Sequence, residues 1–375
     1  MSSRRRNFKA TPTAEEYRQR RQDRYMAIRR ERRQALLDQR RRIPEFRELG
    51  MLAETWENFA ANQRQARQQE LAAMQNPGGG MRANEGRLAE YLYDRRMLNR
   101  TIEGPELDRL RNANQSVEET RRRLSSGRGN VAGDINRDGL QYESTRRTEI
   151  GRAMVNRMQA HEGPMSNSRF GQLSASAAEF TRAGNCGEHA NVATHVHANQ
   201  LGIGETVHSV GSNQTDHAWS ELRSGHDRSS DVIMDAWSNS SAILREDASF
   251  AGNVAHVDTS YSYNQAQGVF ASNQQRQHYN ALDADPGAHQ FADNVHQQMV
   301  NQNFHYTNGV YGTTHASTQD FRRSANAAHN RQNQQNGFLH GIVAAGVARS
   351  LGENVRQATT RANRVMPRGI GTNWE

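Results

Sequence analysis

The stretch Gly184-Asn185-Cys186-Gly187-Glu188-His189-Ala190 contains the only cysteine of the 375-residue chain. A helical pattern runs from this cysteine to about Leu201 and closes at Gly202. It predicts that Cys186 lies in the first turn of a helix, where unpaired N–H groups and the helix dipole favour a thiolate. Cys186 is therefore a candidate nucleophile, and a buried structural cysteine is the alternative interpretation.

Two later stretches supply candidate partners for Cys186. They are Asp216-His217-Ala218-Trp219-Ser220-Glu221-Leu222 and Val232-Ile233-Met234-Asp235-Ala236-Trp237. His217 follows Cys186 by 31 residues (217 − 186), enough for one helix and one strand, and Asp235 follows His217 by 18 (235 − 217), enough for one hairpin. Neighbouring strands then place His217 beside the thiol and Asp235 behind the imidazole. The pattern predicts a Cys-His-Asp catalytic site in which His217 transfers the proton and Asp235 orients the ring.

Four further residues complete the predicted surroundings of the site. Asn185 and Gly187 flank the cysteine, where small neighbours and backbone N–H groups can receive a substrate carbonyl and its oxyanion. Trp219 and Trp237 follow the histidine and the aspartate by two residues, so each shares a sheet face with its partner and can exclude water from it. Ordinary core packing explains the two tryptophans equally well.

The predicted fold is α+β, with helical patterns before the cysteine helix and short strands after it. Polar turns separate the strands, which therefore form a small antiparallel sheet. The predicted strands are 206–210, 217–222 and 232–237, and the predicted helices include 13–42, 46–74, 85–98, 105–124 and 339–365.

The series Gly-Asn-Cys186-Gly-Glu-His-Ala, His217-Ala-Trp-Ser-Glu and Asp235-Ala-Trp resembles the transglutaminase-like superfamily, a circularly permuted papain-like fold. In that superfamily a cysteine on a helix precedes a histidine on one strand and an aspartate on the next. The resemblance covers residues 150–245, and the layout is similar to the transglutaminase-like type III effectors of plant-associated bacteria, the HopX/AvrPphE type. It implies a papain-like core, with the catalytic helix packed on the sheet. It also implies glutamine chemistry or proteolysis on a host protein.

Changes in composition predict five parts of the chain. A polar, basic start precedes an Arg-rich helical region, and a Gly- and Ser-rich linker connects that region to the catalytic domain. A polar segment, solvated over 326–335, then leads into the C-terminal helix. The predicted boundaries are 1–12, 13–125, 126–143, 144–325 and 326–375.

The net charge of +8 points to acidic partners. Arginine runs such as Arg4-Arg5-Arg6 and Arg40-Arg41-Arg42 attract acidic membranes, nucleic acid or acidic proteins without specificity. The same N-terminal region is a candidate binding site for a secretion chaperone. Lys9 is the only lysine. A GC-rich genome explains this, as does selection against ubiquitin acceptors or against self-crosslinking.

No cofactor or metal is expected. His189, His195 and His197 lie on the cysteine helix without a cysteine or carboxylate that would complete a zinc pattern, and they are predicted to be surface or core-edge residues. No apolar run follows the basic start, and Ser2 stands where N-myristoylation needs glycine. The sequence therefore predicts a soluble protein that is secreted without a cleaved signal peptide and, by its resemblance, into the host cell.

Two classes of function remain open from the sequence, and an antibacterial toxin with the chemistry of the first class is a further option. The first is cysteine-dependent acyl transfer, in which the fate of a thioester distinguishes a transglutaminase, a glutamine deamidase and a cysteine protease. The second is a non-enzymatic basic adaptor that binds an acidic protein or nucleic acid through residues 13–125.

Overall fold

The structure, a computed structural model, describes residues 85–136, 141–225, 228–251, 253–312, 314–334 and 347. The chain divides into two units after Pro77, and every described residue belongs to the second unit. The helices predicted over 13–42 and 46–74 lie outside the described residues. Of the helix predicted over 339–365, only Val347 is described, and it is helical and buried in the core.

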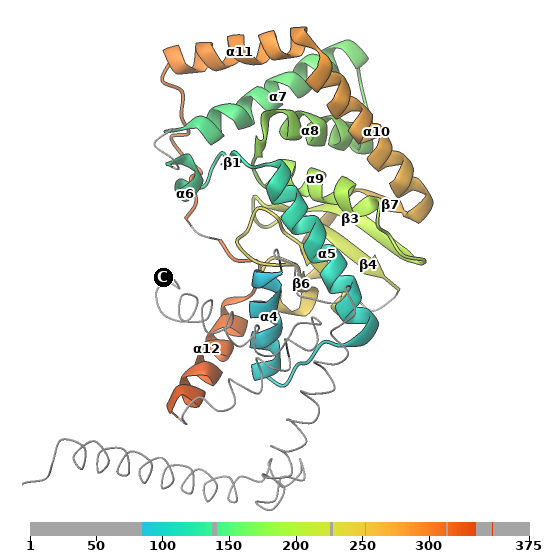
Figure 1. Cartoon of the computed structure of the whole chain (residues 1–375), viewed down its shortest axis with the longest axis vertical. Helices are drawn as coiled ribbons and strands as arrows, with labels where there is room; N and C mark the ends of the chain where they lie inside the picture. The colour runs from blue at the N-terminus through green and yellow to red at the C-terminus, as the bar shows by residue number, and fades with distance from the viewer. Residues whose placement is uncertain are drawn as a thin grey trace, which may run out of the picture. The chain divides into compact units, whose positions relative to one another are not determined.

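The described residues form helices around one main antiparallel sheet, which confirms the α+β class (Figure 1). The α-helices are α4 (Gly86–Met97), α5 (Gly104–Arg123), α6 (Ala132–Ile135), α7 (Glu143–Glu162), α8 (Asn167–Thr181), α9 (Cys186–Ala198), α10 (Gln265–Ala284), α11 (Pro286–Asn301) and α12 (Gln319–Gln334). The strands are β1 (Gly127–Arg128), β2 (Ala183–Gly184), β3 (Glu205–Ser212), β4 (Ala218–Ser224), β5 (Val232–Met234), β6 (Ile243–Leu244) and β7 (Val257–Asn264). Short 3₁₀ turns are η2 (Arg228–Ser230), η3 (Arg245–Asp247) and η4 (Val254–His256).

The sheet has the strand order β6-β5-β4-β3-β7, and every neighbouring pair is antiparallel. A hairpin joins β3 to β4, and its last pair is Gly211 opposite Ala218. On the other side of β4, Ser220 lies opposite Met234 of β5. The residue before β4 and the residue after β5 therefore lie at the same end of the sheet. A separate pair, β1 and β2, runs parallel.

Both faces of the central strand β4 are covered. Helix α9 packs on the face of Ser220, whose hydroxyl accepts a hydrogen bond from Thr194 at 3.0 Å. The opposite face carries Trp219 and Glu221, which contact Phe250 and Arg245 of the segment after β6. Because both faces are buried, four consecutive residues of this strand are buried, and the alternation of a half-exposed strand is lost.

Helix α5 packs against both α9 and strand β5 of the sheet. Leu107, Leu110 and Val117 are buried at helical spacing and belong to the main core, together with residues of the sheet and of α4. Helices α7, α8, α10 and α11 gather at one end of the unit, and α4 packs with α12 at the other (Figure 1). The helices predicted over 85–98 and 105–124 are confirmed within one residue.

One sequence prediction needs correction. The segment predicted as a linker over 126–143 is packed: β1 pairs with β2, and Asn130, Val131 and Ile135 are buried. The segment 326–335, predicted to be solvated, belongs largely to α12, where Ala327 and Asn330 are exposed and Ala328 is buried. The segment 126–143 is rich in glycine, which is why its composition suggested a linker although Val131 and Ile135 are buried.

Candidate catalytic site

Cys186 is the first residue of α9 and is partly exposed. The turn before it is held by Glu188, whose Oε2 accepts the backbone N–H of Asn185 at 2.8 Å. A Cβ on Gly184 would lie 2.5 Å from the Cβ of Glu188, so this close turn requires glycine. A Cβ on Gly187 would meet no atom within 4 Å, so packing does not require glycine there. The helix start therefore presents the thiol, beside first-turn N–H groups that lack helical acceptors.

His217 is fixed by the turn between β3 and β4. Its backbone N–H donates to the Thr215 carbonyl at 2.7 Å, and its carbonyl accepts the Ser212 N–H at 3.0 Å. The strand begins one residue later than predicted, at Ala218. Asp216, the neighbouring carboxylate, is exposed. The carboxylate that contacts the imidazole is that of Asp235, which is buried.

Asp235 lies in the loop that follows β5, not in a strand as predicted. Its Oδ1 accepts the backbone N–H groups of Trp237 and Ser238, both at 3.2 Å. Its Oδ2 lies 3.0 Å from Nε2 of His217, and the carboxylate is buried. The loop thus occupies one carboxylate oxygen and leaves the other for the imidazole.

The thiol of Cys186 lies close enough to the same imidazole to act, after Asp235, on the pKa of His217. Burial alone lowers the pKa of His217, but the charge and hydrogen bond of Asp235, joined by Cys186, raise it to about 10. Burial alone raises the pKa of Asp235, but the charge and hydrogen bond of His217 lower it below its usual value. At neutral pH the pair is therefore an imidazolium and a carboxylate. The three predicted residues lie together in the described structure.

Aromatic rings enclose the imidazole of His217. Trp219 stacks on it with ring centroids 5.7 Å apart, and Trp237 lies at 5.2 Å. Phe250 meets it edge-on at 4.5 Å, and only 11% of the His217 side chain is exposed. Both tryptophans thus lie beside His217, although Trp237 follows the end of β5 and does not share a strand with Asp235 as predicted. The enclosure keeps water away from the ion pair and strengthens it.

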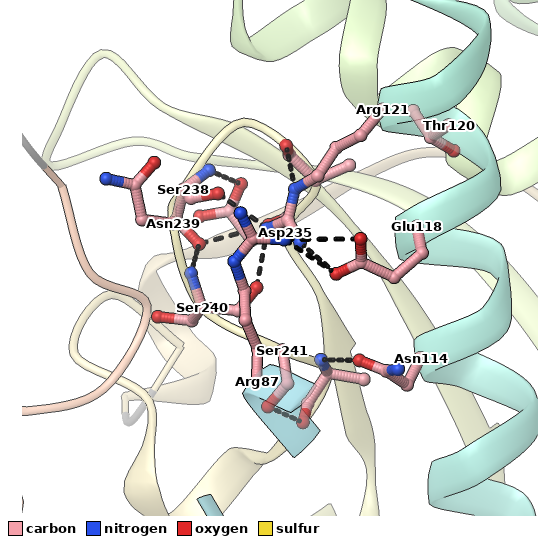
Figure 2. A network of polar contacts seen from close by, with 12 residues as sticks. Arg87, Asn114, Glu118, Thr120, Arg121, Asp235, Ser238, Asn239, Ser240 and Ser241 are labelled. Carbon is pink, nitrogen blue, oxygen red and sulfur yellow. Dashed lines mark hydrogen bonds and ion pairs between the residues drawn. The ribbon is translucent and has the colours of Figure 1, made fainter. Parts of the chain in front are cut away.

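Two arginines hold the loop that carries Asp235. Arg121 of α5 donates to the carbonyls of Ala236, Ser238 and Ser240 (Figure 2). Arg128 of β1 donates to the carbonyl of Trp237 at 2.7 Å and to the side chain of Asn239 at 2.9 Å. Sequence reasoning missed both arginines.

A polar network lies beside the start of α9. Arg152 of α7 pairs with Glu188 at 2.9 Å and with Glu149 at 2.9 Å. The hydroxyl of Tyr306 donates to Glu149, and Nδ2 of Asn185 lies 3.5 Å from the same hydroxyl. Asn185, predicted to belong to the substrate environment, is buried and contacts this network.

The three histidines of α9 are core residues, and their prediction as surface or core-edge side chains is wrong. His189, His195 and His197 are each at most 3% exposed. Burial lowers the pKa of each to about 4, so all three are neutral at physiological pH. Among the described residues, no group of three or more His, Cys, Asp or Glu side chains is arranged to hold a metal ion.

Comparison with known proteins gives no assignment, because no family model, curated protein or solved structure matches the chain. Within the described residues, no helix is both long and apolar enough to cross a membrane.

Proposed function

We propose that the chain is a cysteine-dependent acyl-transfer enzyme with a transglutaminase-like core. One observation carries the proposal: the imidazole of His217 meets Asp235 at 3.0 Å through Nε2 and also interacts with the thiol at the start of α9. Since Nε2 is engaged by the carboxylate, Nδ1 is the ring nitrogen that serves the sulfur. A nucleophile, a base and an orienting carboxylate in this order form the working parts of thiol catalysis.

The reacting form of the sulfur is the thiolate, and the imidazolium of His217 lies beside it. The sulfur of Cys186 attacks the carbonyl carbon of a carboxamide or peptide, and an S–C bond forms while the carbonyl oxygen becomes an oxyanion. First-turn N–H groups of α9 stabilise that oxyanion. His217 then gives its proton to the leaving nitrogen, the C–N bond breaks, and ammonia or an amine departs from a thioester.

The second half restores the thiolate. Water or an amine attacks the thioester, His217 accepts its proton, and the C–S bond breaks. An amine acceptor produces a crosslink, and water produces deamidation or proteolysis according to the bond that was cleaved. The resemblance over residues 150–245 favours a secreted bacterial effector whose substrate is a host protein.

Alkylation of the single thiol tests the proposal. The purified chain is treated with iodoacetamide between pH 5 and 10, and intact mass reports the rate for wild type and for His217→Ala, with Cys186→Ala as the blank. We expect wild type to react at pH 6 and the variant to be slower by on the order of 100-fold, because thiolate is the reacting species. Equal rates would overturn the proposal. Ammonia release from glutamine peptides, amine incorporation and peptide cleavage then separate the three reactions.

A further inference from the structure

Arg121 lies on the buried side of α5, although it belongs to a run of three arginines. It follows Val117 by four residues and therefore continues the stripe that Leu107, Leu110 and Val117 present to the core. The side chain of Arg121 is 17% exposed, while that of its neighbour Arg122 is 72% exposed and pairs with Glu119 on its own helix. The two arginines are thus adjacent in sequence and opposite in environment.

The guanidinium of Arg121 donates along the whole loop after β5. Its Nε reaches the Ala236 carbonyl at 3.2 Å, and its Nη2 reaches the carbonyls of Ser238 at 2.6 Å and Ser240 at 2.5 Å. Its Nη1 donates to Oε1 of Glu118 at 2.6 Å (Figure 2). A planar fork can serve several acceptors at once, which a lysine ammonium at the end of a flexible chain cannot do in the same geometry.

This loop determines where the Asp235 carboxylate lies. Oδ1 of Asp235 accepts the N–H groups of Trp237 and Ser238, so a shift of the loop moves the carboxylate. Arg121 also holds the carbonyl of Ser238, and thus fixes the same residue from the other side. The distance between Asp235 and His217 therefore depends on a side chain from a different element.

We propose that Arg121 is a positioning residue, which acts on the site by holding Asp235 against His217. A role of Arg121 in catalysis rests on the proposed function. Its effect on His217 rests on the loop geometry alone. Glu118 holds the guanidinium in turn and also accepts from Arg87 of α4 at 3.1 Å. The support for the carboxylate thus extends to Arg87 of α4, whose side chain is 49% exposed.

Arg121→Lys tests the inference, with Arg122→Lys as the matched control on the same helix. Both changes keep the charge, so they isolate the geometry of the fork. Two quantities are measured on the full chain: the iodoacetamide rate of Cys186 at pH 7, and the titration of His217 followed by NMR of its ring, assigned by loss of the signal in His217→Gln. We expect Arg121→Lys to slow alkylation on the order of tenfold and to shift the His217 titration below its wild-type midpoint. Arg122→Lys should match wild type.

The outcomes separate the two proposals. If Arg121→Lys melts at a lower temperature but leaves the His217 titration and the alkylation rate unchanged below that temperature, Arg121 is merely structural and the inference is overturned. If wild-type alkylation itself does not depend on His217, the proposed function fails, while the His217 titration still reports whether Arg121 positions Asp235. Should Arg121→Lys fail to fold, Arg121→Gln is judged by the same two measurements.

Discussion

Histidines in two regions of the unit are both largely shielded from solvent, and they differ in their charge. On α9, His195 has Nδ1 on the carbonyl of Asn191 at 2.8 Å and Nε2 near the Tyr263 hydroxyl at 3.2 Å. Burial lowers its pKa to about 4, against the smaller opposing effect of the Asn191 carbonyl. At the end of the sheet, burial also acts to lower the pKa of His217, yet Asp235 and Cys186 raise it to about 10. A charged partner, not depth, decides whether a core histidine is ionised.

The difference has opposite consequences for stability. His217 binds its proton more tightly in the folded chain, so its contribution is complete below about pH 6.5 and is lost as the pH rises towards its folded pKa of about 10. His195 stays neutral when folded, so stability is lost as the pH falls from about 6.5 towards its folded pKa of about 4. The two regions therefore respond in separate pH windows.

Removal of the Asp235 charge beside His217 should have the largest effect on turnover and on the reactivity of Cys186. Asp235→Asn keeps the shape of the side chain but lowers the pKa of His217 from about 10 towards its ordinary value, since the main charge that raises it is lost. We expect turnover to fall by roughly 10²- to 10⁴-fold once a substrate is found, and alkylation of Cys186 at pH 8 to slow.

Asp216→Asn is the matched control for this change, because Asp216 precedes His217 but is exposed. Its alkylation profile should match wild type. Comparable losses in both variants would show that net charge near the site, and not the buried pair, governs the thiol.

The separate pH windows are tested by His217→Gln and His195→Gln. Chemical denaturation between pH 4 and 10 gives the free energy of unfolding of each variant relative to wild type. The stabilising effect of His217 over glutamine should shrink as the pH rises above 6.5, whereas that of His195 should shrink as the pH falls below 6.5, each by on the order of 1–3 kcal/mol across its window. Parallel pH curves for the two variants would contradict the comparison.

The sequence predicted the grouping of Cys186, His217 and Asp235 better than it predicted their surroundings. Cys186, His217 and Asp235 were found because one helix and one hairpin separate them, and such local spacing survives errors at strand ends. Asp235 lies in a loop and not in a strand, yet its position after β5 still brings it to the end of β4 where His217 lies. The spacing of Arg121 from Val117 indicates a buried position, but a run of three arginines is typical of an exposed helix end.

The second half of the unit was not predictable for a physical reason. In α10 the buried residues are Gly268, Ala271 and Gln275, and a Cβ on Gly268 would lie 2.4 Å from the carbonyl oxygen of Ala198. Helices that approach this closely use small residues, so they show no stripe of large apolar side chains for a pattern to detect. In the edge strand β7, Tyr261 and Tyr263 are buried while most of its other residues are exposed, a signal too short to stand out.

The aromatic rings around His217 should have the smallest effect on the reactivity of Cys186, and Trp237→Phe measures that effect. The change keeps a ring beside the imidazole and removes the hydrogen bond from Nε1 to Oδ1 of Asn130, which is 3.0 Å long and buried. We expect a loss of about 1 kcal/mol in the free energy of unfolding and little change in the alkylation rate, because Asp235 still holds the imidazolium. Tyr311→Phe, which retains the ring that meets Trp237 edge-on at 5.5 Å, is the control and should be nearly neutral. Trp237→Phe could instead slow alkylation as much as Asp235→Asn does. In that case the exclusion of water by the rings, and not the carboxylate alone, would explain why His217 is charged while the histidines of α9 are neutral.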